Sequence, residues 1–222
     1  MSASAPAAAR VAPRVFAVPR LYAIADFDLL GERALPGAVA AMADAGVGWI
    51  QLRAKSASGA ALFALAEACC RAVEGSGATL WIDDRVDVAA LLPVGGVHLG
   101  QADLPPAAAR PLLPSSTLLG VSTHDLSQLA AAAADEAVDV VAIGPVFATS
   151  SKAAPDPVVG LDSVRAARRL TAKPLVAIGG IDERNLAAVL AAGADAVAVL
   201  SAVCRGDVAL RARTLLAAAA AA

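Results

Sequence analysis

The chain has 222 residues, of which 58% are hydrophobic, and its formal net charge at pH 7 is −2. This length fits one large α/β domain or two small ones, and the weak negative charge excludes the strongly basic surface of a nucleic-acid-binding protein. No apolar run reaches the roughly 18 residues that span a membrane, so we expect neither nucleic acid nor a membrane as a partner.

The N-terminal segment, residues 1–18, is rich in Ala, Pro and Arg and has no hydrophobic periodicity. We expect a disordered leader there and not a signal peptide, because no continuous apolar stretch follows the positive charges. The cysteines are Cys69, Cys70 and Cys204, an odd number without the spacing of a disulfide framework. Such cysteines are typical of a reducing compartment, which predicts a cytoplasmic protein.

From residue 21 onward, short apolar runs alternate with longer stretches that have helical periodicity. The runs are continuous, as in parallel strands that are buried on both faces. The predicted strands cover residues 21–25, 49–52, 80–83, 96–99, 118–122, 138–143, 175–178 and 196–200. The predicted helices cover residues 36–45, 60–74, 86–91, 126–136, 163–170, 183–192 and 207–218. Residues 105–114 are Pro-rich and predict at most a short helix.

Turn and cap residues support these boundaries. Asp182 precedes one predicted helix as an N-cap, and Gly46 and Gly193 follow two others. Eight strands with intervening helices predict a single (β/α)8 TIM barrel over residues 19–216, with residues 217–222 as a frayed Ala tail. The alternative is an open doubly wound sheet, which would normally carry a glycine-rich turn after its first strand, and this chain has none there.

Acidic residues follow two strands that are neighbours in this barrel. Asp83 and Asp84 end the third predicted strand, and Asp103 comes shortly after the fourth. Reactive groups of a TIM barrel lie at the carboxyl ends of its strands, so Asp84 and Asp103 can converge there on a Mg²⁺ ion that also binds phosphate. The alternative is structural: Asp84 would cap the next helix, and Asp103 would begin the turn before Pro105.

Basic residues follow the second strand. Arg53 and Lys55 are two residues apart on an extended segment, so their side chains point to the same side. A guanidinium grips two phosphate oxygens in a fork, whereas an ammonium acts as a mobile point charge. Only three lysines occur, Lys55, Lys152 and Lys173, so each can mark a need for a compact ammonium. The alternative is an ordinary solvated loop with surface charges.

Hydroxyl groups and two histidines lie near the fourth and fifth strands. Ser122 ends the fifth strand and can donate a hydrogen bond to a phosphate or a carbonyl group. His124 follows it and is either a proton carrier or a residue that orders the start of the next helix. His98 lies within the fourth strand, and we expect it to be a core histidine.

The loops after the last three strands predict anion binding. The loop after the sixth strand is long and hydroxyl-rich, contains Thr149, Ser151 and Lys152, and is typical of a lid or a binding loop. Gly180 and Ser201 follow the seventh and eighth strands, whose loops form the recurrent phosphate site of this fold. Together with the metal-assisted region, this predicts two anion regions, suited to a pyrophosphate and a separate monophosphate.

Nine segments carry a family resemblance, in order, over about residues 20–204. They are Leu21-Tyr22-Ala23-Ile24-Ala25-Asp26, Gln51-Leu52-Arg53-Ala54-Lys55, Asp83-Asp84-Arg85-Val86-Asp87, Gly96-Val97-His98-Leu99-Gly100-Gln101-Ala102-Asp103, Gly120-Val121-Ser122-Thr123-His124, Gly144-Pro145-Val146-Phe147, Thr149-Ser150-Ser151-Lys152, Ala177-Ile178-Gly179-Gly180-Ile181 and Val199-Leu200-Ser201. Every predicted strand end is represented. In these segments the chain resembles the thiamine phosphate synthase family.

The resemblance implies an enzyme that works on phosphorylated small molecules with Mg²⁺. Members of this family join 4-amino-5-hydroxymethyl-2-methylpyrimidine diphosphate to 4-methyl-5-(2-phosphoethyl)thiazole, forming thiamine phosphate and pyrophosphate. The resemblance also implies a dissociative course, in which the pyrimidine C–O bond breaks first and the ring amino group stabilises the carbocation. The thiazole nitrogen then attacks.

Residue roles are carried over by motif. The resemblance implies that Mg²⁺ is held by Asp84 and Asp103. It implies that the pyrimidine diphosphate is bound by Gln51, Arg53, Lys55, Ser122 and Lys152, and the thiazole phosphate by Thr149, Ser151, Gly180 and Ser201. Asp83 and Leu200 complete the substrate-binding set. The residues expected to carry catalysis are Arg53, Lys55, Ser122 and Lys152.

Four residues depart from the family pattern. Asp83 stands where Asn is usual, Ala148 replaces a usual Pro, and Ser150-Ser151 lie in a usually Thr-rich segment. A further carboxylate that faces pyrophosphate repels it unless Mg²⁺ intervenes or the acid is protonated. Two other functions stay open: a thiazole tautomerase, the close relative, with His124 as proton carrier, and a non-catalytic barrel that binds phosphate ligands. A homo-oligomer also stays open.

Overall fold

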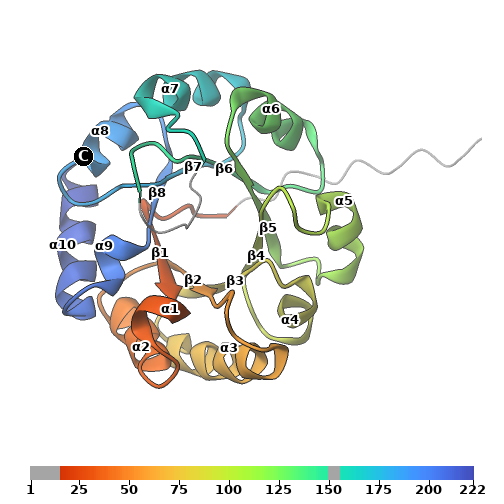
Figure 1. Cartoon of the computed structure of the whole chain (residues 1–222), viewed down its shortest axis with the longest axis vertical. Coiled ribbons are helices and arrows are strands. Elements are labelled where there is room, and N and C mark those ends of the chain that lie inside the picture. Colours follow the sequence, from red (N-terminus) through yellow and green to blue (C-terminus); the bar gives the residue numbers. More distant parts are fainter. Residues whose placement is uncertain (1–15, 150–155) are drawn as a thin grey trace, which may run out of the picture.

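The computed structural model describes residues 16–149 and 156–222. Eight parallel strands form a closed barrel in chain order, in which β1 also pairs with β8 (Figure 1). The strands are β1 (Leu21–Asp26), β2 (Trp49–Arg53), β3 (Thr79–Asp83), β4 (Gly96–Leu99), β5 (Leu118–Thr123), β6 (Val140–Ile143), β7 (Leu175–Ile178) and β8 (Ala196–Val199). The single (β/α)8 TIM barrel predicted from the apolar runs is therefore confirmed.

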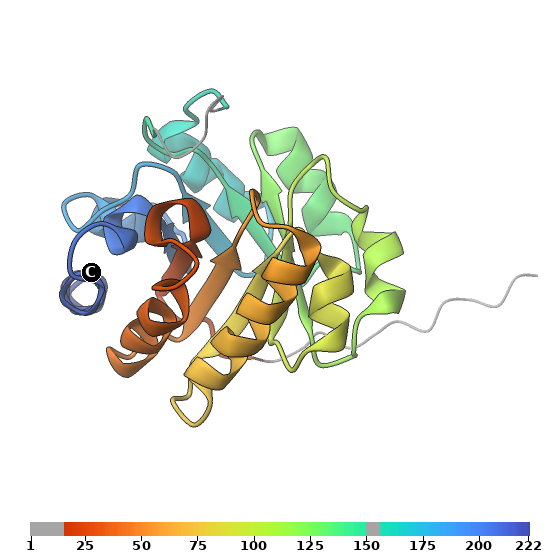
Figure 2. The same ribbon diagram turned by 60° about the horizontal axis from the view of Figure 1, so that its bottom comes forward.

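Helices surround the sheet on its outer face (Figures 1 and 2). Those that match the sequence prediction are α2 (Leu35–Asp44), α3 (Gly59–Val73), α4 (Val86–Leu91), α6 (Leu126–Ala134), α7 (Gly160–Leu170), α8 (Leu186–Ala191) and α10 (Val208–Ala220). The Pro-rich segment forms α5 (Pro106–Ala109) and the 3-10 turn η1 (Arg110–Leu112). Two short helices lie outside the prediction and follow β1 and β8: α1 (Phe27–Leu30) and α9 (Ser201–Cys204).

Alternation along each strand divides its side chains between two apolar layers. On β1, Ala23 and Ala25 face the layer between sheet and helices, whereas Tyr22 and Ile24 face the barrel interior. Every residue of β1 is buried, which explains why the strand reads as a continuous apolar run. The interior layer is built largely from residues near the amino ends of the strands, so the carboxyl ends are left to form a cavity.

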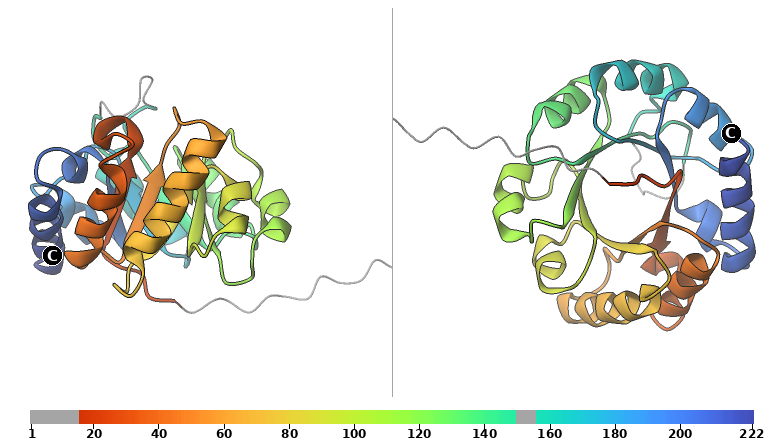
Figure 3. Two further views of the ribbon diagram at one scale, coloured as in Figure 1. Left: turned by 90° about the horizontal axis from the view of Figure 1, so that it is seen from below. Right: turned by 180° about the vertical axis from the view of Figure 1, so that it is seen from behind.

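An aromatic cluster closes the amino end of the barrel. The ring centroids of Trp49 and Trp81 are 4.7 Å apart, and those of Tyr22 and Trp49 are 5.5 Å apart. The first described residues cross this end (Figure 3), and the ring of Phe16 lies 6.1 Å from that of Trp49. Val18 packs on the same cluster. The predicted end of the leader after residue 18 is therefore wrong, because Phe16 and Val18 bury apolar surface in the barrel; the rest of the leader lies outside the described residues.

We expect Phe16→Ala to lower the free energy of unfolding by about 1–2 kcal/mol, less than for a fully buried Phe because this ring is only partly buried. Urea unfolding followed by circular dichroism measures the change. Ala17→Ser is the matched control, since Ala17 is exposed beside it and should leave stability unchanged. Equal stability of the Phe16 variant and the parent would show that this contact contributes nothing.

The C-terminal helix is longer than its predicted extent. α10 continues to Ala220, and Ala219 is buried. The Ala219 carbonyl also accepts a hydrogen bond from Nη1 of Arg20 at 3.3 Å. The prediction of a frayed tail from residue 217 is therefore wrong up to Ala220, because alanine favours helix and one side of this turn packs on the core.

Helix ends follow the predicted caps in part. Gly46 and Gly193 have φ values of 99° and 108°, as expected for glycines that end helices. Asp182 does not cap α8, because its carboxylate accepts a hydrogen bond from the Arg184 N–H in the turn before the helix. Within the described residues, no helix combines the length and the apolar character needed to cross a membrane.

Candidate active site

A cavity of about 400 Å³ lies at the carboxyl ends of the strands. Its lining includes residues that end or follow β2 to β8, together with Tyr22 and Ile24 from within β1. The predicted site residues that line it are Gln51, Arg53, Lys55, Asp83, Asp84, Asp103, Ser122, Thr149, Gly180, Leu200 and Ser201. Ser151 and Lys152, also predicted, lie outside the described residues.

Asp84 and Asp103 come together after β3 and β4. Asp84 has a φ of 62°, which is uncommon for a residue other than glycine, and its N–H donates to the His98 carbonyl at 2.9 Å. These features fix the turn that carries the Asp84 carboxyl. Burial raises the pKa of Asp84, and the nearby Asp103 carboxyl also raises it, against the opposite effect of Lys55. Two carboxylates held this close are stabilised by a bound cation.

This pair suits Mg²⁺ better than a metal that needs an all-protein cage. Among the described residues, no group of three or more His, Cys, Asp or Glu side chains could hold a metal ion. Mg²⁺ usually binds through one or two carboxylates and completes its octahedron with water and substrate phosphate. Asp84 does not cap α4, because that helix has no side-chain cap. Oδ2 of Asp103 accepts from the Gly100 N–H at 2.7 Å, so the Asp103 carboxylate closes the turn that follows β4.

Arg53 and Lys55 extend from β2 toward the same acidic groups. The Arg53 Nε and the Lys55 Nζ lie 3.8 and 3.9 Å from Oδ2 of Asp83. Lys55 Nζ is also 2.6 Å from Oδ2 of Asp84. Both side chains line the cavity on one side, as their spacing predicts. These cations balance the carboxylates and lie where a phosphate group at the strand ends would meet them.

Asp26 organises this side of the site, a role that its place at the end of the first motif does not indicate. It is the last residue of β1 and is 3% exposed. One carboxylate oxygen accepts from the Leu29 N–H at 3.1 Å and caps α1, and the other pairs with the Arg53 guanidinium. Asp26 and Arg53 are register partners in β1 and β2, so the closed sheet itself sets this contact.

The Asp83 carboxyl lies in an environment that disfavours its ionised form. Burial, followed by the neighbouring Asp84 carboxyl, raises the pKa of Asp83 to about 7, although Lys55 and Arg53 act in the opposite direction. The ionised form is therefore unfavourable in the folded protein. Because the folded pKa lies above the ordinary value near 4, the folded state binds the proton more tightly than the unfolded state between about pH 4 and pH 7. Stability should fall as pH rises through that window.

Asp83→Asn is therefore expected to leave stability nearly unchanged at about pH 4 and to raise it progressively up to pH 7, by on the order of 3–4 kcal/mol above pH 7. Urea unfolding in EDTA across this range measures the difference between variant and parent. Asp87→Asn is the control, because the exposed Asp87 pairs with Arg85 and its pKa is lowered, first by that contact. A gain for Asp83→Asn that did not vary with pH would contradict the electrostatic explanation.

Two hydrogen bonds lie deeper in the barrel. Gln51 donates from Nε2 to the Tyr22 hydroxyl at 2.9 Å, and Nε2 of His98 lies 2.9 Å from Oγ of Ser122. Burial lowers the pKa of His98 to about 4, so its ring is neutral at pH 7. His98 is buried, as a core histidine should be, but it also lines the cavity and contacts a predicted site residue. Tyr22 lines the cavity too, although the motif that contains it does not indicate a role for it.

The contacts of His124 fit both interpretations that the sequence leaves open. Its N–H donates to Oε1 of Gln128 at 2.8 Å and so orders the start of α6. Its ring lines the cavity, and Nδ1 lies 2.8 Å from the Gly144 carbonyl oxygen and 3.5 Å from Oδ2 of Asp156. A histidine held in this way can carry a proton at the cavity.

The loop after β7 forms a backbone wall of the cavity. Gly180 has a φ of 64°, and a Cβ there would lie 2.5 Å from the Ala148 carbonyl oxygen, so only glycine fits. The Phe147 N–H donates to the Gly179 carbonyl at 3.0 Å, which joins the loops after β6 and β7. Ser201 begins α9 on the neighbouring strand end. This part of the cavity offers backbone and hydroxyl groups without carboxylates.

The fold and the site together define a class: this is a TIM-barrel enzyme that acts on small phosphorylated molecules. A sequence profile described as thiamine monophosphate synthase (TMP-TENI) matches residues 21–203, which is most of the barrel. The chain belongs to the thiamine monophosphate synthase family, as its strand-end motifs predict.

Relatives of known name span the same barrel. A thiamine-phosphate synthase from Koribacter versatilis (strain Ellin345) is 46% identical over 189 residues, covering 83% of this chain and 88% of that protein. One from Albidiferax ferrireducens is 42% identical over 201 residues, covering 89% and 91%. A solved thiamine phosphate pyrophosphorylase from Pyrococcus furiosus superposes with a TM-score of 0.81 at 30% identity, covering 91% of this chain and 96% of that one. The similarity therefore includes every strand end that lines the cavity.

Proposed function

We propose that this protein is a thiamine phosphate synthase, which joins 4-amino-5-hydroxymethyl-2-methylpyrimidine diphosphate to 4-methyl-5-(2-phosphoethyl)thiazole and releases pyrophosphate. The observation that carries the proposal is one cavity whose lining joins charged groups after β2, β3 and β4 to backbone and hydroxyl groups after β7 and β8. Asp84, Asp103 and Arg53 suit a metal-bound diphosphate, and Gly180 and Ser201 suit a monophosphate. The names of the relatives, which this chain matches over most of their length, support the same activity.

Mg²⁺ fits the first region. Asp84 and Asp103 would hold it, since their carboxyls are close enough for Asp103 to raise the pKa of Asp84. Bound there, the ion would neutralise negative charge that develops on the departing pyrophosphate. Lys55, now 2.6 Å from Asp84, can then turn its ammonium from the carboxylate to a phosphate oxygen.

The proposed reaction breaks one bond before it forms the other. The electron pair of the pyrimidine C–O bond leaves with pyrophosphate, and the ring amino group stabilises the carbocation. The lone pair of the thiazole nitrogen then forms the C–N bond. Neither step needs a general base, so the chain contributes positioning and charge. Arg53, Lys55 and Ser122 would bind the leaving group, and the same role is proposed for Lys152.

The apolar interior would seat the two heterocycles. Tyr22 and Ile24 of β1 and Val176 and Ile178 of β7 line the cavity beneath the polar strand ends. An apolar surround keeps water from capturing the carbocation before the thiazole nitrogen reaches it. The rings would therefore meet inside the barrel, with their phosphate groups at opposite sides of its mouth.

We also propose a reducing, cytoplasmic environment. The supporting observation is that all three cysteines are free, with Cys69 and Cys204 buried. Burial raises the pKa of the Cys69 thiol to about 12, so it stays protonated and unreactive.

The test of the proposed function is product formation by the purified full-length chain. With both substrates and Mg²⁺, thiamine phosphate should appear with an equal amount of pyrophosphate, and EDTA should stop the reaction. Tautomerisation of a thiazole phosphate that is lost in His124→Ala, without thiamine phosphate synthesis, would favour the tautomerase. Calorimetric binding of both substrates with neither activity would favour a non-catalytic barrel.

A further inference from the structure

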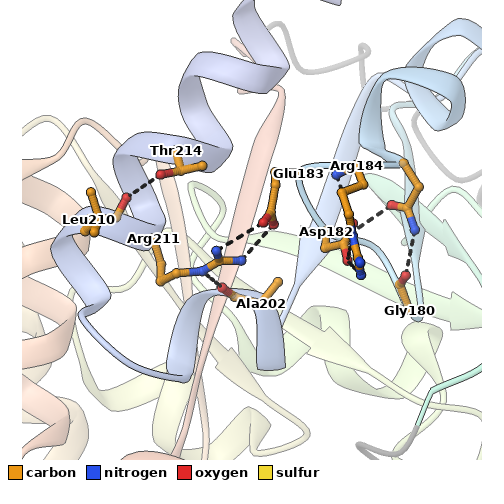
Figure 4. Close-up of polar contacts among 9 residues, drawn as sticks. Gly180, Asp182, Glu183, Arg184, Ala202, Leu210, Arg211 and Thr214 are labelled. Atoms are coloured by element: carbon orange, nitrogen blue, oxygen red, sulfur yellow. Dashed lines mark hydrogen bonds and ion pairs between the residues drawn. The ribbon is translucent and has the colours of Figure 1, made fainter.

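Arg211 on α10 connects segments that lie far apart in the sequence (Figure 4). Its Nε donates to the Ala202 carbonyl in α9 at 2.8 Å. Its Nη1 and Nη2 donate to Oε1 and Oε2 of Glu183, in the loop after β7, at 3.2 and 2.7 Å. One guanidinium therefore joins an outer helix to the two strand-end loops that carry Gly180 and Ser201.

Both contacts lie next to residues that line the cavity. Ala202 directly follows Ser201, and Glu183 is three residues after Gly180. The turn that separates Glu183 from Gly180 is held by Asn185. Its Nδ2 donates to the Gly180 carbonyl and its Oδ1 accepts from the Asp182 N–H, each at 2.9 Å. A displacement of Glu183 would therefore reach Gly180 instead of being absorbed within the loop.

The geometry suits positioning more than global stability. The side chains of Arg211 and Glu183 are 29% and 31% exposed, and ion pairs at such exposure contribute little to overall stability. The two parallel N–H···O contacts nevertheless fix the direction of the carboxylate, which a single contact would not do. Gly180 is closely packed, since a Cβ there would lie 2.5 Å from the Ala148 carbonyl oxygen and 2.8 Å from Cβ of Phe147.

We propose that Arg211 is a positioning residue for the phosphate monoester of the thiazole substrate. Acting through Glu183 and Ala202, it keeps the loop of Gly180 and the start of α9 at the spacing that one phosphate group needs. The inference rests on the proposed function, because it places the monophosphate on the β7–β8 side of the cavity. Loss of this contact should weaken binding of the thiazole phosphate and leave binding of the pyrimidine diphosphate unchanged.

The experiment compares Arg211→Met, Arg211→Lys and Glu183→Gln with the parent in steady-state kinetics. For Arg211→Met we expect the KM for the thiazole phosphate to rise about tenfold, while the KM for the pyrimidine diphosphate stays within about twofold. Arg211→Lys should recover part of the loss, because an ammonium cannot reproduce the forked contact. Arg165→Met is the control, since it removes an arginine whose ion pair with Asp162 lies within α7 and is more exposed, and neither residue lines the cavity.

Equal increases in both KM values, or no increase in either, would overturn the inference. If Arg211→Met does not fold, Glu183→Gln decides, because it keeps the shape of the side chain and should raise only the thiazole phosphate KM. A parent protein that makes no thiamine phosphate would refute the proposed function separately. Calorimetry of the parent and Arg211→Met, with the thiazole phosphate and with inorganic pyrophosphate, then tests the role of Arg211 alone. Weaker binding of the thiazole phosphate only supports the inference, and equally weaker binding of both refutes it.

Discussion

Replacing Asp84 or Asp103 by asparagine is expected to lower kcat/KM for thiamine phosphate formation by roughly 10²- to 10³-fold. Either change removes one of two carboxylates that would hold Mg²⁺ against the leaving pyrophosphate. Asparagine is the suitable replacement at Asp84, because it tolerates the φ of 62° better than alanine does. At Asp103 it retains an oxygen that can accept the hydrogen bond from the Gly100 N–H.

The measurement is a Mg²⁺ titration of the initial rate for each variant and the parent. If the carboxylates bind the metal, the variants should need more Mg²⁺ for half-maximal rate and recover part of their activity at high concentration. Asp87→Asn is the control, since Asp87 lies nearby in the sequence but pairs with Arg85. Full activity of either site variant in EDTA would exclude a metal role for these residues.

Arg53→Met is expected to weaken binding of the pyrimidine diphosphate by roughly 10²-fold and to leave the thiazole phosphate nearly unaffected. Arg53 lines the cavity beside Asp83, and losing a forked guanidinium from a diphosphate removes charge-assisted hydrogen bonds worth about 1.5–3 kcal/mol each. Calorimetry with each substrate measures the two affinities separately.

This variant also leaves the buried Asp26 without its ion-pair partner, so stability should fall. The double variant Asp26→Asn with Arg53→Met separates the two effects, because it removes the unpaired charge while keeping the site without its guanidinium. Its stability should partly recover and its diphosphate affinity should stay low. Parallel losses for both substrates in the double variant would mean that the two anion regions are not distinct. The resemblance predicts the same selectivity for Lys152→Ala.

The strands could be predicted from sequence because their burial on both faces leaves a continuous apolar run. The predicted limits of β4 and β7 agree with the structure, whereas β6 begins two residues later than its run, at Val140. There the Val138 N–H donates to the Asp135 carbonyl at 3.1 Å, so this apolar residue belongs to a turn and not to the strand. The helices α1 and α9 are one turn long, which is too short for periodicity to show.

The site was predictable where a charged or hydroxyl group interrupts an apolar run, as Arg53 and Asp84 do at the ends of their strands. Residues that act through contacts with neighbouring strands or helices were not predictable. Asp26 matters because β1 and β2 pair in a register that places it beside Arg53, and sequence spacing contains no such information. Arg211 lies 28 residues from Glu183, and the packing of α10 beside α8 and α9 brings them together.

The aromatic cluster at the amino end contains both tryptophans of the chain. Trp49 and Trp81 are 4% and 0% exposed, so their emission should be blue-shifted in the folded protein and move to longer wavelength when this end of the barrel opens. Neither indole is among the described residues that line the cavity. Intrinsic fluorescence should therefore respond strongly to unfolding and to loss of the Phe16 contact, and respond to substrates only through Tyr22, which lines the cavity and packs against both indoles.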